Sequence, residues 1–158
     1  MAGAGQVLTN YLLDTNHCSF LLRGHPGLIR KLRELGEAPA ATCVIVQGEL
    51  VFMAHKSDHP STNEERVRQF LRGIAVLPLD RHTADRYGKL KAAVLERYGP
   101  REKVKRRKAQ LRELGFQDND LWIAALAERY ELILVTSDSD FERLSHVGSF
   151  AVENWLVE

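Results

Sequence analysis

The chain has 158 residues, 44% of them hydrophobic and 27% charged, and its formal net charge is +1. This length and composition are typical of one globular domain over residues 1–158 with a buried core, and the near-zero net charge points to no particular partner. The start of the chain lacks the apolar segment of a secretion signal, and no run of about 18 apolar residues is present that would span a membrane. We therefore expect a cytoplasmic protein without a membrane span, and we expect residues 1–6 to form a flexible N-terminus.

Short apolar runs and helical patterns alternate along the sequence. The apolar runs predict strands at 7–13, 40–45, 74–77, 132–135 and 151–153. Amphipathic spacing and capping residues predict helices between them, at 15–22, 28–35, 46–56, 61–71, 81–98, 101–114, 121–130 and 140–145. Because strands that are separated by helices tend to pair in parallel, the pattern predicts an α/β fold with a mainly parallel sheet covered by helices.

Four acidic residues occupy places that such a sheet brings to one edge. Asp14 and Asp138 each follow a predicted buried strand, whereas Glu49 and Asp120 lie in the first turn of a predicted helix. The carboxyl ends of parallel strands and the N-termini of the following helices meet at one edge, where ligands bind. Each acid alone has an ordinary explanation as a turn, cap or first-turn residue. Together they predict a site of converging carboxylates.

Convergence of the four carboxylates has an electrostatic cost that a cation removes. Two unit charges about 4 Å apart repel by about 4 kcal/mol at an effective dielectric constant of about 20. Oxygen ligands suit Mg²⁺ or Mn²⁺ better than zinc, and these ions activate water and neutralise phosphate in phosphodiester hydrolysis. Thr136, Asn16 and Asp140 are expected to support the acids or a metal-bound water, whereas Asp118 is expected in a loop or cap.

The segments around these acids resemble the four acidic blocks of PIN-domain nucleases, in particular VapC-type toxins of toxin–antitoxin pairs. They are residues 12–16 (LLDTN), 48–50 (GEL), 119–125 (NDLWIAA) and 135–141 (VTSDSDF). The resemblance extends from about Val7 to Val152 and implies a PIN-like three-layer α/β/α sandwich. It implies an endoribonuclease that depends on Mg²⁺ or Mn²⁺ and cleaves structured RNA such as tRNA. It also implies a homodimer and a small VapB-like antitoxin, with the metal ligands Asp14, Glu49, Asp120 and Asp138.

A basic helical insertion at 101–115 is longer than the corresponding loop of the family usually is. Residues 101–112 contain seven basic side chains and one acidic side chain. The segment is either a solvated helix face, an arm that binds RNA phosphates, or a docking site for the antitoxin. An acidic site repels RNA, so positive charge elsewhere has to supply affinity. The candidate RNA-binding residues are Lys105, Arg106, Arg107 and Lys108.

Three alternatives to a ribonuclease toxin remain open. The chain could be a PIN-type nuclease that acts in RNA processing or on DNA, a PIN module that binds without catalysis, or a small-molecule phosphatase. His17 is expected on the surface of its helix, and Trp122 and Trp155 are expected in the core or an interface. Cys18 and Cys43 have no metal-ligand spacing, so we expect two reduced, buried thiols.

Overall fold

The structure is a computed structural model that describes residues 10–36 and 40–156. The predicted flexible N-terminus and the first part of the predicted strand at 7–13 lie outside the described residues. In the described residues, five strands form one sheet, with bounds β1 (Tyr11–Leu13), β2 (Ala40–Cys43), β3 (Ala75–Leu77), β4 (Ile133–Val135) and β5 (Val152–Glu153).

The sheet is parallel and its strand order reverses at β1. The order is β3-β2-β1-β4-β5, and every neighbouring pair runs in the same direction. The chain therefore builds the sheet from β1 toward β3 and then returns to add β4 and β5 on the other side. Such a reversal opens a crevice at the carboxyl ends of the two strands that flank it, here β1 and β4.

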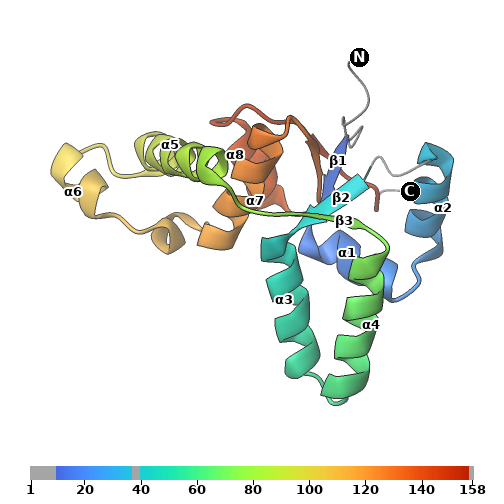
Figure 1. Cartoon of the computed structure of the whole chain (residues 1–158). Coiled ribbons are helices and arrows are strands. Elements are labelled where there is room, and N and C mark those ends of the chain that lie inside the picture. Colours follow the sequence, from blue (N-terminus) through green and yellow to red (C-terminus); the bar gives the residue numbers. More distant parts are fainter. Residues whose placement is uncertain (1–9, 37–39, 157–158) are drawn as a thin grey trace.

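Helices cover both faces of the sheet (Figure 1). On one side lie α1 (Thr15–Leu22), α2 (Pro26–Leu35), α3 (Val44–His55) and α4 (Pro60–Arg72), of which α3 and α4 form a projecting hairpin. On the other side lie α5 (Arg81–Tyr98), α7 (Asp118–Arg129) and α8 (Ser139–Ser145). The short helix α6 (Lys103–Lys108) and the 3-10 helix η1 (Leu111–Leu114) connect α5 to α7. This arrangement confirms the predicted three-layer α/β/α fold.

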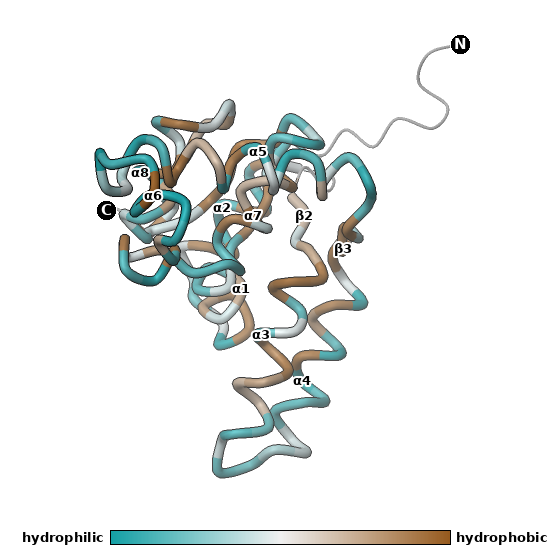
Figure 2. The backbone as a smooth tube through the Cα atoms, turned by 90° about the vertical axis from the view of Figure 1, so that its left-hand side faces the viewer, coloured by the Kyte–Doolittle hydropathy of each residue, from teal (hydrophilic) through white to brown (hydrophobic). Residues whose placement is uncertain are grey.

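The core forms where the strands meet α7. Leu12, Leu13, Leu134 and Val135 are fully buried, and α7 presents a face of leucine, isoleucine and small alanine side chains to them. The alanines allow a close approach of the helix to the sheet. Figure 2 shows hydrophobic segments in β2, β3 and the inner part of the α3–α4 hairpin, whereas α6 and the tip of the hairpin are hydrophilic. Within the part of the chain that the structure describes, no helix is both long and apolar enough to cross a membrane.

Several predicted helices have different bounds in the structure, and two of the differences affect the acids and the basic segment. The helix predicted at 46–56 starts two residues earlier, at Val44, because the strand before it ends at Cys43. The helix predicted at 101–114 is broken at Ala109 and Gln110, which have extended backbones. The break lets Leu111 pack into the core, while Lys103, Lys105, Arg107 and Lys108 of α6 are exposed to solvent.

The two cysteines are free and buried, as predicted. Burial raises the pKa of the Cys18 thiol to about 12 and the pKa of the Cys43 thiol to about 11. Trp122 of α7 stacks on Tyr87 of α5 with the ring centroids 3.8 Å apart, as expected of a residue that packs between helices.

Candidate active site

Three carboxylates form a cluster at the carboxyl edge of the sheet, which we call the carboxylate cluster: Asp120, Asp138 and Asp140. One ligand atom from each lies within 4.8 Å of the corresponding atoms of the other two. Asp120 lies in the first turn of α7, Asp138 caps α8 just after β4, and Asp140 lies in the first turn of α8. The two helix starts therefore bring the three acids together from different parts of the chain.

The surroundings of Asp120 disfavour its ionised form in the absence of a cation. They raise the pKa of Asp120 from its usual value of 3.8 to about 7. Burial is the largest cause, because it removes the carboxylate from water, and the charges of Asp138, Glu49 and Asp140 add repulsion. A divalent cation would offset the burial and the repulsion, and hard cations prefer oxygen ligands of this kind. The cluster therefore has the donor atoms and the electrostatics of a metal site.

Two neutral side chains hold Glu49 near Asp120. The Thr15 hydroxyl donates a hydrogen bond to Glu49 Oε2, and Asn119 Nδ2 donates one to Glu49 Oε1 at 2.9 Å. Thr15 follows Asp14 at the start of α1, so the bonds connect α1, α3 and α7 at the site. Glu49 was predicted in the first turn of its helix but lies in the second, because α3 begins at Val44.

Asp14 ends β1 at the point where the strand order reverses. Its backbone N–H donates to Val135 O at 3.1 Å, which extends the pairing of β1 with β4 by one residue. Its side-chain Oδ1 accepts a hydrogen bond from the backbone N–H of His17 at 2.8 Å and thereby caps α1. Asp14 is buried, with 4% of the residue exposed, and its carboxylate lies outside the carboxylate cluster.

Comparisons with known proteins identify the family. The PIN domain family model matches residues 11–147, which include all five of these acids. The tRNA(fMet)-specific endonuclease VapC of Shigella flexneri is 30% identical to this chain, over 94% of the chain and 99% of its own length. Ribonuclease VapC2 of Haemophilus influenzae is 28% identical, over 94% of the chain and 100% of its own length. The chain belongs to the PIN-domain family, among its VapC-type ribonuclease toxins.

Solved structures show the same PIN fold. DNA-bound VapBC from Salmonella typhimurium matches with a TM-score of 0.73 at 26% identity, covering 93% of this chain and 98% of that chain. VapBC2 from Rickettsia felis, bound to a DNA fragment of its promoter, also has a TM-score of 0.73, at 23% identity, and covers 93% of this chain and 99% of that chain. The family, fold and ribonuclease class predicted from the acidic blocks are confirmed.

The predicted supporting residues of the PIN domain lie in different settings. Thr136 is buried, and its Oγ1 accepts a hydrogen bond from the backbone N–H of Asp138 at 3.0 Å, which orders the turn that carries that acid. Asp140 belongs to the carboxylate cluster itself. Asn16 is exposed on α1. Asp118 is the first residue of α7, accepts a hydrogen bond from the Tyr87 hydroxyl, and is not a member of the cluster.

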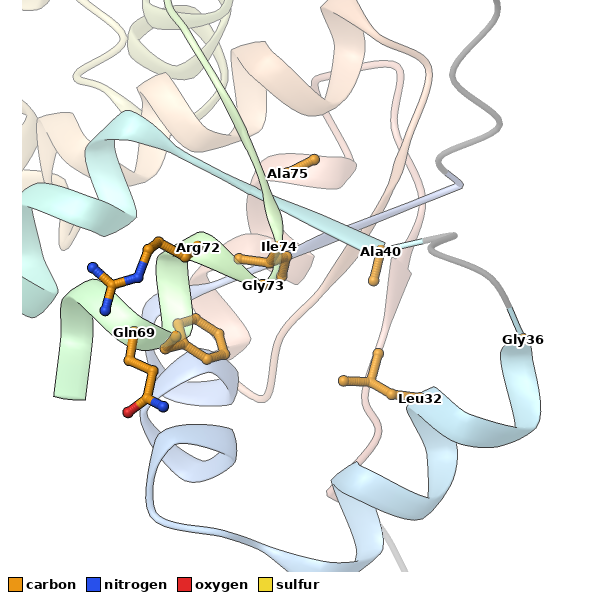
Figure 3. A pocket seen from close by; sticks show the side chains of 9 residues that line it. Leu32, Gly36, Ala40, Gln69, Arg72, Gly73, Ile74 and Ala75 are labelled. Carbon is orange, nitrogen blue, oxygen red and sulfur yellow. The ribbon is translucent and has the colours of Figure 1, made fainter.

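A hollow at the opposite edge of the sheet is separate from these acids (Figure 3). Its volume is about 730 Å³, and it is lined by Leu32, Gly36, Ala40, Gln69, Phe70, Arg72, Gly73, Ile74 and Ala75. Ala40 and Ala75 are the first residues of β2 and β3, so the hollow lies at the amino ends of the strands. Parallel sheets bind their ligands at the carboxyl ends, and this hollow is therefore not part of the candidate active site.

Three residues around the acids were not predicted to support them: Thr15, Asn119 and Arg143. Thr15 and Asn119 are sequence neighbours of Asp14 and Asp120, and this adjacency was an available signal. Arg143 lies three residues after Asp140, with Nη1 3.5 Å from Asp140 Oδ1, and its guanidinium stacks 4.2 Å from the centroid of the Phe116 ring.

The prediction that His17 lies on a helix surface is wrong. Its side chain is 1% exposed, and Nδ1 lies 3.1 Å from Asp14 Oδ1. The physical reason is that α1 begins directly after Asp14, so that its third residue turns inward beneath the C-terminal segment and contacts Trp155.

Proposed function

We propose that the chain is a metal-dependent endoribonuclease that works as a single PIN domain, in the cytoplasm, as the toxin of a VapBC-type pair. The observation that carries this proposal is the carboxylate cluster, in which three acids lie within 4.8 Å of one another and Asp120 has a pKa of about 7. At an effective dielectric constant of about 20, each charged pair at that distance costs roughly 3 kcal/mol. This arrangement fits a site whose charge is balanced by a divalent cation.

The proposed metal is Mg²⁺ or Mn²⁺, with the ligands Asp14, Glu49, Asp120 and Asp138. Asp140 is added to this set because it lies within the carboxylate cluster. When bound, such an ion lowers the pKa of a coordinated water and neutralises the phosphate that is attacked. The chain's own part is to orient the ligands: Thr15 and Asn119 hold both oxygens of Glu49, and Asn16, exposed beside Thr15, is proposed to contact the water or the substrate.

The proposed RNA-binding surface is α6. Lys105, Arg107 and Lys108 are exposed, and Arg106 is partly buried against the end of α5. Lys105 Nζ is 3.4 Å from Glu102 Oε2, but both side chains are more than half exposed, and such a surface pair neutralises little of the basic charge. Positive charge at this place would supply the phosphate affinity that an acidic site lacks.

Arg143, which lies next to Asp140, anchors the segment that connects α6 to the carboxylate cluster. Arg143 Nη2 donates to Leu114 O at 3.2 Å, while Nη1 faces Asp140 Oδ1. Leu114 ends η1, which leads from α6 to the first turn of α7 and thus to Asp120. RNA held on α6 would therefore lie on a segment that Arg143 connects to the edge of the sheet with the carboxylate cluster.

Structured RNA such as tRNA is the proposed substrate class, and a VapB-like antitoxin is the proposed partner. The relative from Shigella flexneri is named as a tRNA(fMet)-specific endonuclease, and the similar structures from Rickettsia felis and Salmonella typhimurium are VapBC complexes. A homodimer is proposed on the basis of α3, where the exposed residues Val44, Gly48 and Phe52 recur every four positions and form one apolar stripe.

RNA cleavage by matched variants tests the proposed site. Purified protein, treated with chelator, is incubated with total tRNA before and after addition of Mg²⁺ or Mn²⁺. We expect cleavage only with metal, and we expect Asp14→Asn and Asp120→Asn to reduce it by at least the roughly 10- to 100-fold typical of losing an outer-shell partner of a metal. Asp118→Asn is the control, because Asp118 lies two residues from Asp120 on the same helix but outside the cluster.

The other outcomes identify the alternatives. Cleavage that persists in Asp120→Asn or after chelation would place the chemistry elsewhere. Metal-dependent cleavage of DNA in place of RNA would indicate a different PIN nuclease, and binding of RNA without cleavage would indicate a non-catalytic module. Hydrolysis of phosphomonoesters alone would indicate a phosphatase.

A further inference from the structure

His17 is enclosed between the Asp14 carboxylate and the C-terminal segment. Its side chain is 1% exposed. On one side of the ring, Nδ1 lies 3.1 Å from Asp14 Oδ1, and on the other side Nε2 lies 3.4 Å from the backbone nitrogen of Trp155. The imidazole therefore connects Asp14 to Trp155, which lies 138 positions after His17 in the chain.

These two contacts determine which ring nitrogen carries the proton. A backbone N–H can only donate, so its bond to Nε2 requires a lone pair on that atom. In a neutral imidazole the proton then resides on Nδ1, which donates to Asp14 Oδ1. The same oxygen also accepts from the backbone N–H of His17 at 2.8 Å. Two donors from one residue thus hold a single oxygen of Asp14.

We propose that His17 is a positioning residue, which holds Asp14 Oδ1 through two hydrogen bonds, so that Oδ2 is the oxygen that would be available to a metal. This inference rests on the proposed function, in which Asp14 is a metal ligand. Carboxylates that bind metals are themselves hydrogen-bonded in turn, and these outer partners orient the ligand before the metal arrives. A carboxylate that is already ordered loses less conformational entropy when the metal binds, so His17 raises the affinity of the site.

The C-terminal segment holds His17 in this tautomer. After β5 ends at Glu153, the Trp155 indole packs edge-on against Tyr11 of β1, with ring centroids 5.1 Å apart. Its Nε1 donates to Glu153 Oε1 at 2.8 Å. These contacts fix the backbone of Trp155 beside the ring of His17. The segment around Trp155 thus influences the candidate active site by orienting His17, without supplying a metal ligand itself.

Two substitutions separate the contacts of His17. In His17→Asn the side-chain amide lies near the place of Nδ1 and keeps a donor for Asp14. In His17→Gln the amide lies near the place of Nε2, so it keeps the contact with Trp155 and loses the donor to Asp14. Both variants bury one side-chain amide in place of the imidazole, so the free-energy cost of burying a polar group is matched between them.

Mn²⁺ binding to the chelator-treated full chain, measured by calorimetry, is the main readout. We expect His17→Gln to bind Mn²⁺ roughly 10- to 100-fold more weakly than wild type. We expect the affinity of His17→Asn for Mn²⁺ to exceed that of His17→Gln by roughly tenfold or more. Urea unfolding of both variants accompanies the titration. A purely structural role would lower the stability of both and leave Mn²⁺ affinity unchanged, which would overturn the proposal.

Two further comparisons complete the test. Asp14→Asn reports on the proposed function: if it binds Mn²⁺ like wild type, Asp14 is not a ligand and that assignment fails. If Asp14→Asn binds weakly while the two His17 variants bind equally, only the positioning role of His17 is refuted. In addition, ¹⁵N NMR of the metal-free wild-type imidazole should show a protonated Nδ1 and an unprotonated Nε2, and the opposite pattern would overturn the proposal.

Discussion

Replacing Asp120 with Asn removes one of three carboxylates whose ligand atoms lie within 4.8 Å of one another, and it tests whether their repulsion weakens the metal-free protein. The surroundings place the pKa of Asp120 at about 7 in the folded chain, against 3.8 for an ordinary aspartate. Asparagine occupies nearly the same volume but does not ionise. The substitution should therefore stabilise the metal-free protein, and the gain should depend on pH.

The sign and size of the effect follow from proton linkage. Below pH 3.8 the carboxyl group is protonated in both states, and the burial and repulsion have no effect on folding. As the pH rises to about 7, the unfolded chain loses the proton while the folded chain keeps it, so folding of the wild type becomes less favourable. A pKa rise of this size is equivalent to at most about 4 kcal/mol. Asp120 is partly exposed, and solvent screening reduces the expected value to about 2 kcal/mol.

Urea and thermal unfolding of chelator-treated wild type and Asp120→Asn, between about pH 4 and pH 8, measure this difference. We expect the two proteins to be equally stable near pH 4, and the variant to be more stable by about 2 kcal/mol above pH 7, or about 4–8 °C in melting temperature for a chain of this size. Adding Mn²⁺ should favour the wild type by about 2.7 kcal/mol at 100 times Kd, with a smaller gain for the variant. A pH-independent difference, or parallel Mn²⁺ titrations of the two proteins, would refute the reasoning. Asp118→Asn should show neither effect.

Three other predictions concern the surroundings of the site. Neutralising the four basic residues from Lys105 to Lys108 should weaken RNA binding and lower its salt slope by roughly 0.7 to 0.9 per lost phosphate contact; an unchanged slope in filter binding would identify α6 as a solvated face. Asn119→Ala should release one oxygen of Glu49 and raise the Mg²⁺ concentration needed for half-maximal cleavage by roughly tenfold, and an unchanged Mg²⁺ dependence would remove Asn119 from the site. The thiols of Cys18 and Cys43, with pKa values raised to about 12 and about 11 by burial, should resist alkylation at pH 8 until the chain is unfolded in urea, and labelling of the native protein would contradict their burial.

The sequence alone was sufficient to predict the fold class and the edge of the sheet where the acids gather. Asp14, Asp120 and Asp138 each adjoin the end of a strand or the start of a helix, and these boundaries are marked by local signals such as apolar runs and capping residues. In a parallel sheet such boundaries meet at one edge whatever the strand order. Local sequence patterns could therefore predict the edge of the sheet at which the acids lie, without knowledge of any tertiary contact.

The tertiary structure decided which acids touch and what holds them. That Asp140 joins Asp120 and Asp138, while Asp14 pairs with His17, depends on the strand order and on the rotation of each helix about its axis. A local sequence pattern determines neither the strand order nor the rotation of a helix about its axis. The contact between His17 and Trp155, which are 138 residues apart, exists only because β5 pairs with β4. Contacts between residues so distant in sequence arise from the packing of the whole chain, and for that reason only the folded structure reveals them.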